Sequence, residues 1–543
     1  MLHGFANDKH EWESTSDAAD GRDKWHWNSH WFARHGFYVL TYTARGFRTD
    51  APDKPYEPAT PAGTSASLPN GTIHLKSREF EVRDTQWLAA VAAQAFPDID
   101  TDRVAVTGGS YGGGESWLQA SQPTWDFPHE ASRGALPVLQ LQVAVPKYGW
   151  TDLAYSLAPN GHPGPGGIYD SAQRGNPIGT LKLSYVNGFY ALGTTDGIFE
   201  AGTTTTLSDE GPISIPAWKA RSADTGDPYD VSGAEDPLIA QQRRGLTEFR
   251  SSYYQDWSVS GRKVAIFAIQ GWTDDLFPAV ESFRQFRALK ALDPQWPVAL
   301  ALADVGHPRA QGRAATWHWL NKRAFRFLRT QIQGSHDQAT SVWSEPTSCG
   351  DRAFRTHVRA ATPEGLARGT LTVSYAQGDT LTWLGGTGDP DGVATDPVTG
   401  GAACRESSAA TWPGRYTAVS EPLPRRATYV SLGTVRVPYT LLGGTTATLD
   451  ARLWDVAPSG RALFVDRGTY RIDVPAYDTA SGTLELPLFG NHWPFAAGHR
   501  VRLDLSQVDE PFARPSNVAT SLTFGPPTLT LPVREPGSLS VGG

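Results

Sequence analysis

A serine set among glycines has a spacing typical of a catalytic nucleophile. The stretch Gly108-Gly109-Ser110-Tyr111-Gly112 fits G-x-S-x-G, follows the apolar run DRVAV and precedes the helical stretch GGESWLQAS. A sharp turn between a strand and a helix exposes such a serine hydroxyl for attack on a carbonyl carbon. The two flanking glycines relieve crowding, and the start of the helix stabilises negative charge on the reacting oxygen.

The same glycines are a poor match to a phosphate-binding loop. A Walker loop needs Lys and then Ser or Thr after its last glycine, but Gly114 is followed by Glu115, whose charge repels phosphate. No frame through residues 108–114 supplies the three glycines of a dinucleotide fingerprint. A structural turn with an incidental serine stays open on the motif alone, because a nucleophilic serine needs a base and an acid.

Candidates for that base and acid follow two later strands. The run VAIFAIQ ends in GWTDDLFP, which places Asp274 and Asp275 on the next loop, and VALALAD ends in VGHPRAQ, which places His307 likewise. The carboxyl ends of parallel strands share one edge of a sheet, where catalytic groups gather. We therefore expect His307 to deprotonate Ser110 and Asp274 to orient the imidazole, with Asp275 as the alternative acid.

Short apolar runs alternate with helical patterns through the first 330 residues, which predicts an α/β fold with a parallel sheet. Residues 150–255, rich in Gly, Pro, Trp and Tyr, read as an inserted cap, and an all-β domain follows residue 340. The expected helices are Arg83–Ala95 and Phe277–Leu292. The expected strands are Phe37–Tyr42, Arg103–Thr107, Leu139–Val145, Val264–Ile269 and Val298–Asp304, then Thr370–Tyr375, Thr428–Pro438, Thr446–Trp454, Thr469–Val474 and Arg500–Leu505.

Composition narrows the function further. The chain has 543 residues and a net charge of −8, which disfavours a general nucleic-acid binder. No apolar run approaches the roughly 20 residues of a transmembrane helix, and the first residues lack a secretory signal. Cys349 and Cys404 could form a disulfide or stay free thiols, so localisation is open between secretion and the cytoplasm. The sequence does not indicate an oligomeric state.

Several motifs together resemble the serine hydrolases that group X-Pro dipeptidyl-peptidases with cocaine-esterase-like acyl hydrolases. They are GGSYGG, ARGF at 44–47, GWTD, GHPR, LWDVAPSG at 453–460, GHRVRLDL at 498–505 and DEPFARPS. The resemblance implies an α/β-hydrolase core with a mostly helical cap over residues 1–335, and a C-terminal jelly-roll domain over 340–543. It also implies an acyl-enzyme mechanism that needs no cofactor or metal.

The chain departs from that family in its first residues. Cocaine-esterase-like members use a tyrosine hydroxyl as one oxyanion donor, but here the corresponding loop reads His3-Gly4-Phe5. We therefore expect the backbone N–H groups of Tyr111 and Phe5 to form the oxyanion hole. Only Met1 and Leu2 precede this loop, so the central strand before it, and two earlier strands, are expected upstream, with a signal peptide as a further possibility.

Two other patterns could suggest metal sites. His26, His30 and His35 could place two imidazoles on one helix face, but no acidic or Cys partner lies nearby, so a Trp-rich helix packed on the sheet is the better interpretation. The stretch GDPDGVATD at 388–396 resembles a calcium loop weakly, and an ordinary turn is favoured.

The resemblance leaves the substrate open between peptides with proline in second position and small-molecule esters or amides. A dipeptidyl-peptidase must bind a free ammonium group, for which Glu115, Asp152 and Glu200 are the candidate carboxylates. A third alternative is a catalytically inert protein that binds a polymer or glycan through its β domain. We rank the X-Pro dipeptidyl-peptidase or a related acyl hydrolase first.

Overall fold

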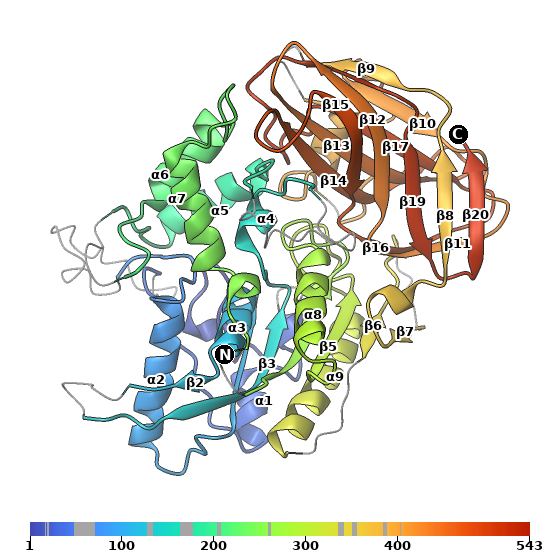
Figure 1. Ribbon diagram of the computed structural model, residues 1–543. Helices are drawn as coiled ribbons and strands as arrows, with labels where there is room; N and C mark the ends of the chain where they lie inside the picture. Colours follow the sequence, from blue (N-terminus) through green and yellow to red (C-terminus); the bar gives the residue numbers. More distant parts are fainter. Residues whose placement is uncertain are drawn as a thin grey trace.

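The computed structural model describes residues 1–543 except 17, 19–20, 48–70, 128–133, 163–176, 203–207, 259–261, 335–340, 350–355, 384–387 and 402. Figure 1 shows a helix-flanked sheet below, with helices α5, α6 and α7 and a large β-rich part above it. Of the helices in the described ranges, none combines the length and apolar character that a bilayer crossing needs.

In the first sheet, β1, β3, β4, β5 and β6 are parallel to one another, whereas β7 and the short β2 pair in the antiparallel sense. Because parallel strands are buried on both faces, their sequences are almost continuously apolar. All six residues of β5 are buried, for example. The strand order is β1 (Val104–Gly109), β3 (Leu139–Lys147), β4 (Ala265–Gly271), β5 (Val298–Ala303), β6 (Val342–Ser344) and β7 (Val358–Ala360), with β2 (Thr124–Trp125) beside β3.

Helices cover both faces of this sheet. Leu300 and Leu302 of β5 pack in the cluster that contains α2, α3 and α8, whereas the alternating Ala299 and Ala301 pack in the cluster with α1 and α9. This period of two is what a strand imposes. The helices are α1 (Ser29–Arg34), α2 (Glu81–Ala95), α3 (Tyr111–Ser121), α8 (Val280–Leu292) and α9 (Ala314–Ile332).

Four of the five strands expected in this half form, within a few residues of their predicted bounds, and Phe37–Tyr42 does not. Leu2, rather than residues 37–42, pairs with the outer edge of β1: its backbone N–H donates to Thr107 O at 2.8 Å. The Met1 amine donates to Leu40 O at 2.7 Å. Elsewhere a cavity of about 670 Å³ separates residues 37–42 from β1. The prediction is wrong because, within the described chain, this backbone has no neighbouring strand with which to form a ladder.

The described parts of residues 150–255 are mainly helical. They contain α4 (Leu153–Leu157), α5 (Leu183–Thr195), α6 (Ile215–Lys219) and α7 (Pro237–Glu248). Asp152, Ser214 and Asp236 cap three of these helices through side-chain oxygens that accept backbone N–H groups. In Figure 1 the arrowheads of β3 and β5 point toward these helices, so the helices lie over the carboxyl ends of the strands.

The C-terminal part is a sandwich of two sheets around one apolar core. The smaller sheet is β10 (Arg415–Val419), β17 (Arg500–Ser506), β13 (Thr446–Val456) and β14 (Ala462–Asp473). The larger sheet follows the path β16 (Asn491–Phe495), β11 (Ala427–Ser431), β19 (Thr528–Val533), β12 (Thr434–Leu442), β18 (Ser521–Phe524) and β9 (Asp379–Thr382), with β15 (Ser481–Pro487), β8 (Gly369–Ser374) and β20 (Gly537–Gly542) attached. The predicted strand 428–438 is two strands, β11 and β12.

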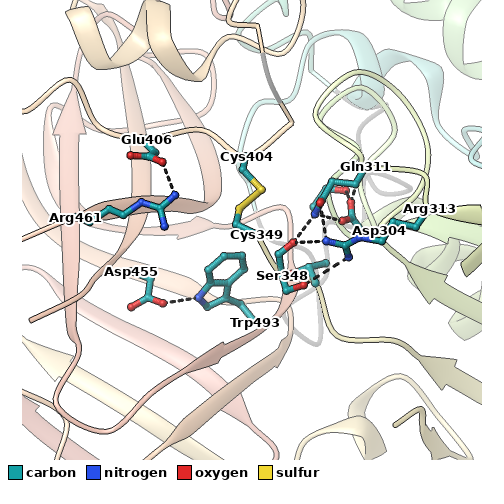
Figure 2. The surroundings of a disulfide bond; sticks show 12 residues. Asp304, Gln311, Arg313, Ser348, Cys349, Cys404, Glu406, Asp455, Arg461 and Trp493 are labelled. Carbon is teal, nitrogen blue, oxygen red and sulfur yellow. Dashed lines mark hydrogen bonds and ion pairs between the residues drawn. A yellow bond between two sulfur atoms is a disulfide. The ribbon is translucent and has the colours of Figure 1, made fainter. Parts of the chain in front are cut away.

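A disulfide answers the question left open by the two cysteines. Cys349 and Cys404 are bonded to each other, with their Cα atoms 5.5 Å apart (Figure 2). The backbone oxygen of Ser348 accepts hydrogen bonds from the side chains of Gln311 and Arg313. The disulfide therefore lies where the loop after β5 meets the chain that leads into the sandwich.

Candidate active site

Ser110 lies at the turn between β1 and α3. Its backbone has φ 53° and ψ −112°, a strained conformation for a residue with a side chain. The turn passes so close to its neighbours that a Cβ on Gly112 would lie 2.3 Å from Leu2 O. The glycine at this position is therefore required by packing, and the turn directs the Ser110 hydroxyl away from the sheet edge into a pocket.

Three side chains form a continuous hydrogen-bonded relay. Ser110 Oγ lies 2.7 Å from His307 Nε2, and His307 Nδ1 lies 2.8 Å from Asp274 Oδ2. Asp274 and His307 follow β4 and β5, so the parallel sheet brings these distant residues to one edge. This arrangement can move a proton from a hydroxyl to an imidazole whose positive charge a carboxylate stabilises.

The Asp274 carboxylate is fixed from its other side. Its Oδ1 accepts the backbone N–H groups of Leu276 and Phe277, both at 3.0 Å, and the residue is buried. Lys182 from the cap region donates to Leu276 O at 2.8 Å, and burial lowers the pKa of its amine to about 7. The loop that carries Asp274 is therefore held by its own backbone and by Lys182, which directly precedes α5.

Asp275, the alternative acid, has a different partner. Its carboxylate accepts two hydrogen bonds from Arg309, at 2.9 and 2.7 Å. Burial would raise the pKa of Asp275, but Arg309 and Arg467 together hold it below its ordinary value. The structure brings Asp274, rather than Asp275, to the imidazole.

Tyr111 and Phe5 lie beside Ser110 and line the same pocket, with their rings 5.3 Å apart. Tyr111 is the first residue of α3, where a backbone N–H has no acceptor within the helix. Its hydroxyl is directed elsewhere, toward Glu81 Oε1 at 3.3 Å and the N–H of Lys76 at 3.2 Å. The backbone of Tyr111, rather than its phenol, is thus placed to meet an oxyanion.

Aromatic rings surround the imidazole of His307. The ring centres of Phe277 and Tyr148 lie 5.0 and 5.7 Å from it, and those of Tyr185 and Phe189 lie 6.4 Å away. The sequence analysis missed these residues. The available signal was the four-residue spacing of Tyr185 and Phe189, which places both on one face of a helix.

The pocket beside Ser110 has a volume of about 120 Å³ and almost entirely apolar walls. Tyr111 begins α3, Phe5 and Phe277 lie on loops, and the remaining walls come mostly from helices α4 to α7. Those walls are Leu153 and Leu157 on α4, Val186, Phe189 and Tyr190 on α5, Ile215, Trp218 and Lys219 on α6, and Gln242 and Leu246 on α7.

The three carboxylates considered for ammonium binding lie outside the set of residues that line this pocket. Glu115 is buried and 2.6 Å from Lys76 Nζ. Asp152 accepts a hydrogen bond from the Tyr254 hydroxyl at 2.7 Å, and Glu200 accepts one from the Thr72 hydroxyl at 2.7 Å. Each carboxylate is engaged within the protein.

The two weak metal patterns have other surroundings. His26 stacks between Trp25 and Trp31, and His35 Nδ1 lies 2.7 Å from Trp31 O. Residues 390–395 form a short helix, α10 (Pro390–Thr395), where a turn was expected. The prediction of a turn is wrong because the Asp389 side chain accepts the backbone N–H of Asp391 and so stabilises the start of a helix. Among the described residues, no group of three or more His, Cys, Asp or Glu side chains could hold a metal ion.

No family model and no curated protein matches this sequence. Solved structures do match. An aminopeptidase from the marine sediment archaeon Thaumarchaeota archaeon is 13% identical, with 86% of this chain and 81% of that chain covered and a TM-score of 0.52. An α-amino acid ester hydrolase is 13% identical, with 98% and 92% covered and a TM-score of 0.61. A CocE/NonD family hydrolase from Staphylococcus aureus is 12% identical, with 86% and 77% covered and a TM-score of 0.47.

At 13% identity, the likeness to the first two structures concerns the fold. It extends over most of each chain, so it includes the sheet with its helices and the β-rich C-terminal part. Together with the sheet order, it fits an α/β-hydrolase fold followed by an all-β domain.

Proposed function

We propose that the protein is a serine hydrolase that cleaves an ester or amide through an acyl-enzyme. The observation that carries the proposal is the relay from Ser110 through His307 to Asp274 at an apolar pocket. This contact between nucleophile, base and acid recurs in serine hydrolases of unrelated folds, whatever their substrate.

Each residue of the relay has one role in this mechanism. As Ser110 Oγ bonds to the substrate carbonyl carbon, its proton passes to His307 Nε2, and Asp274 stabilises the resulting imidazolium. The backbone N–H groups of Tyr111 and Phe5 stabilise the oxyanion, each contributing roughly 3 kcal/mol. His307 then protonates the leaving group as its bond to carbon breaks.

Water completes the cycle. His307 accepts a proton from a water molecule as the water oxygen attacks the acyl carbon. The bond to Ser110 Oγ breaks, the serine regains its proton, and the carboxylic acid leaves.

The pocket favours an acyl esterase or amidase over an X-Pro dipeptidyl-peptidase. A dipeptidyl-peptidase needs a carboxylate that faces the substrate ammonium, and no acidic residue is among the described residues that line the pocket. Glu115, Asp152 and Glu200 have partners of their own. Among the described lining residues, the nucleophile is therefore not accompanied by an ammonium site, which supports the esterase or amidase.

Labelling by a fluorophosphonate probe tests the mechanism and separates an enzyme from an inert binding protein. We expect the wild type to be labelled and Ser110→Ala not to be, with Ser232→Ala, at an exposed position, as the matched control. Hydrolysis of p-nitrophenyl butyrate should be lost in the same variant. Equal labelling of wild type and Ser110→Ala would contradict the assignment.

A further inference from the structure

The walls around Ser110 offer a substrate little besides apolar surface. Phe5, Tyr111, Phe189 and Phe277 line the pocket with the nucleophile. Besides Ser110, only Ser222 and Gln242 among the described lining residues have an aliphatic hydroxyl or an amide side chain. The Ser222 hydroxyl donates to Gln242 Oε1, so this pair satisfies part of its hydrogen-bonding capacity internally. A polar acyl group would lose its water here without gaining equivalent partners.

Two lysines at or behind the pocket wall offer no counter-charge to a cationic substrate. Lys219 is the one charged side chain among the described lining residues, and its Nζ pairs with Asp224 Oδ1 at 2.6 Å. Lys76 Nζ lies 4.5 Å from the centre of the Tyr111 ring, behind the pocket wall. Among the described lining residues, a substrate ammonium would thus find no carboxylate to balance its charge.

The pocket volume sets the size of the group it accepts. A cavity of about 150 Å³ with apolar walls accommodates a benzene molecule. This pocket has a volume of about 120 Å³, so it accommodates a group of about the size of benzene or slightly smaller. A group of about six carbons therefore fills it, and a longer chain must extend beyond it.

We infer that the pocket binds the acyl part of the substrate and selects an uncharged, apolar acyl group of about six carbons. This inference rests on the proposed function, because it requires the acyl group to reach Ser110. According to this inference, the protein is an acyl hydrolase that discriminates against α-amino acyl esters and against peptides with a free N-terminus.

A pair of substrates that differ by one ammonium group tests the charge selection. These are the p-nitrophenyl esters of hydrocinnamic acid and of phenylalanine, compared below pH ~7, where an α-amino group is protonated. We expect kcat/KM for the hydrocinnamate to be about 100-fold higher, because an unpaired ammonium in an apolar site is strongly disfavoured. Equal values, or a preference for the phenylalanine ester, would overturn the inference.

The half-ester of adipic acid with p-nitrophenol extends the test to anions. It matches the hexanoate ester in length but carries a carboxylate at the far end. We expect it to be a poor substrate because Lys219 is already paired. Faster cleavage of the half-ester than of the hexanoate would show that Lys219 anchors an acid, and the uncharged class would then be wrong.

Acyl length is tested with p-nitrophenyl acetate, butyrate, hexanoate and laurate. We expect kcat/KM to rise about 10-fold or more from acetate to hexanoate, since added methylenes enter the apolar pocket, and to rise no further with laurate. A flat series, or a continued rise to laurate, would contradict the size limit.

A substitution that fills part of the pocket tests whether this wall contacts the acyl group. Val186→Phe narrows the pocket from α5, whereas Leu192→Phe adds bulk at an exposed position of the same helix. We expect Val186→Phe to lower hexanoate cleavage about 10-fold more than acetate cleavage, and Leu192→Phe to leave both unchanged. Equal losses for acetate and hexanoate would contradict the assignment of this wall to the acyl group.

The outcomes separate the two proposals. Failure of the proposed function shows as no fluorophosphonate labelling at Ser110 and no cleavage of any ester. Failure of the substrate inference shows as normal labelling and acetate cleavage, without the expected preference for hexanoate and hydrocinnamate.

Discussion

Arg309 donates two hydrogen bonds to Asp275, one from Nε at 2.9 Å and one from a terminal nitrogen at 2.7 Å. Asp275 is next to Asp274 on the loop after β4, and Arg309 is two residues after His307 on the loop after β5. The pair therefore joins the loop that carries Asp274 to the loop that carries His307. Arg467 on β14 of the sandwich approaches the same carboxylate at 3.8 Å.

Breaking this pair is expected to disturb the relay without removing any of its members. We predict that Asp275→Asn lowers kcat about 10-fold and the free energy of unfolding by about 3 kcal/mol, because it leaves the buried Arg309 charge without its partner. Denaturant unfolding and kcat on p-nitrophenyl butyrate measure the two effects.

Asp274→Asn is the matched comparison. It should lower kcat about 10⁴-fold, since the amide favours the wrong imidazole tautomer, with a smaller loss of stability. A larger loss of kcat in Asp275→Asn than in Asp274→Asn would reverse the roles assigned to the two carboxylates.

Gly306, directly before His307, lies against Asp274. It has φ +115°, and a Cβ at this position would lie 2.2 Å from Asp274 Oδ2. We predict that Gly306→Ala lowers kcat/KM on p-nitrophenyl butyrate by about 100-fold, because a small displacement of a catalytic group has an effect of this size.

Gly334→Ala controls for backbone strain alone. Gly334 has φ +74°, and nothing lies within 4 Å of its added Cβ. This variant should lose some stability and keep its turnover. Equal turnover in Gly306→Ala and Gly334→Ala would show that contact with Asp274 is unimportant.

The sequence predicted the geometry of the relay from strand order alone. Ser110, Asp274 and His307 each follow a strand of a parallel sheet, so their side chains meet at one edge even though Ser110 and His307 are 197 residues apart. This works because the position of a residue at a strand end is a local property that the sheet converts into proximity.

What the sequence could not predict depends on contacts between distant elements. Residues 37–42 have the composition of a strand but lack a neighbouring strand in the described chain, and composition does not show neighbours. The pairing of Asp275 with Arg309, and the contact with Arg467, required knowledge of how the sandwich meets the loops. The aromatic shell of His307 likewise includes Tyr148 from the end of β3 and Tyr185 from α5.

The disulfide is expected to contribute to stability. Cys349 and Cys404 are 55 residues apart, and closing a loop of that length in the unfolded chain stabilises the folded state by about 4 kcal/mol. We predict that the Cys349→Ser, Cys404→Ser double variant loses about that much free energy of unfolding. Wild type in a thiol reductant should behave similarly, and equal denaturant midpoints with and without reductant would contradict the prediction.

Lys147 gives the protein a characteristic pH dependence. Its Nζ is buried near the rings of Trp12, Trp27 and Trp317, and it donates to Asp23 O at 2.9 Å. Burial lowers its pKa to about 7, against an ordinary value of about 10.5. Between these values the unfolded chain holds a proton that the folded chain has released, so this lysine makes stability rise with pH.

The slope of the unfolding free energy against pH, measured between pH ~8 and ~10, tests this prediction. The lower limit avoids Asp450, whose pKa burial raises to about 8 and whose own effect on stability has the opposite sign. We expect Lys147→Met to reduce the slope by about 1.4 kcal/mol per pH unit, the equivalent of one proton.

Lys182, whose pKa is also about 7, contributes a similar slope that remains in this variant. Lys182→Met should therefore reduce the slope by the same amount, and the double variant should reduce it twice as much. An unchanged slope in Lys147→Met would mean that the buried Lys147 amine stays protonated.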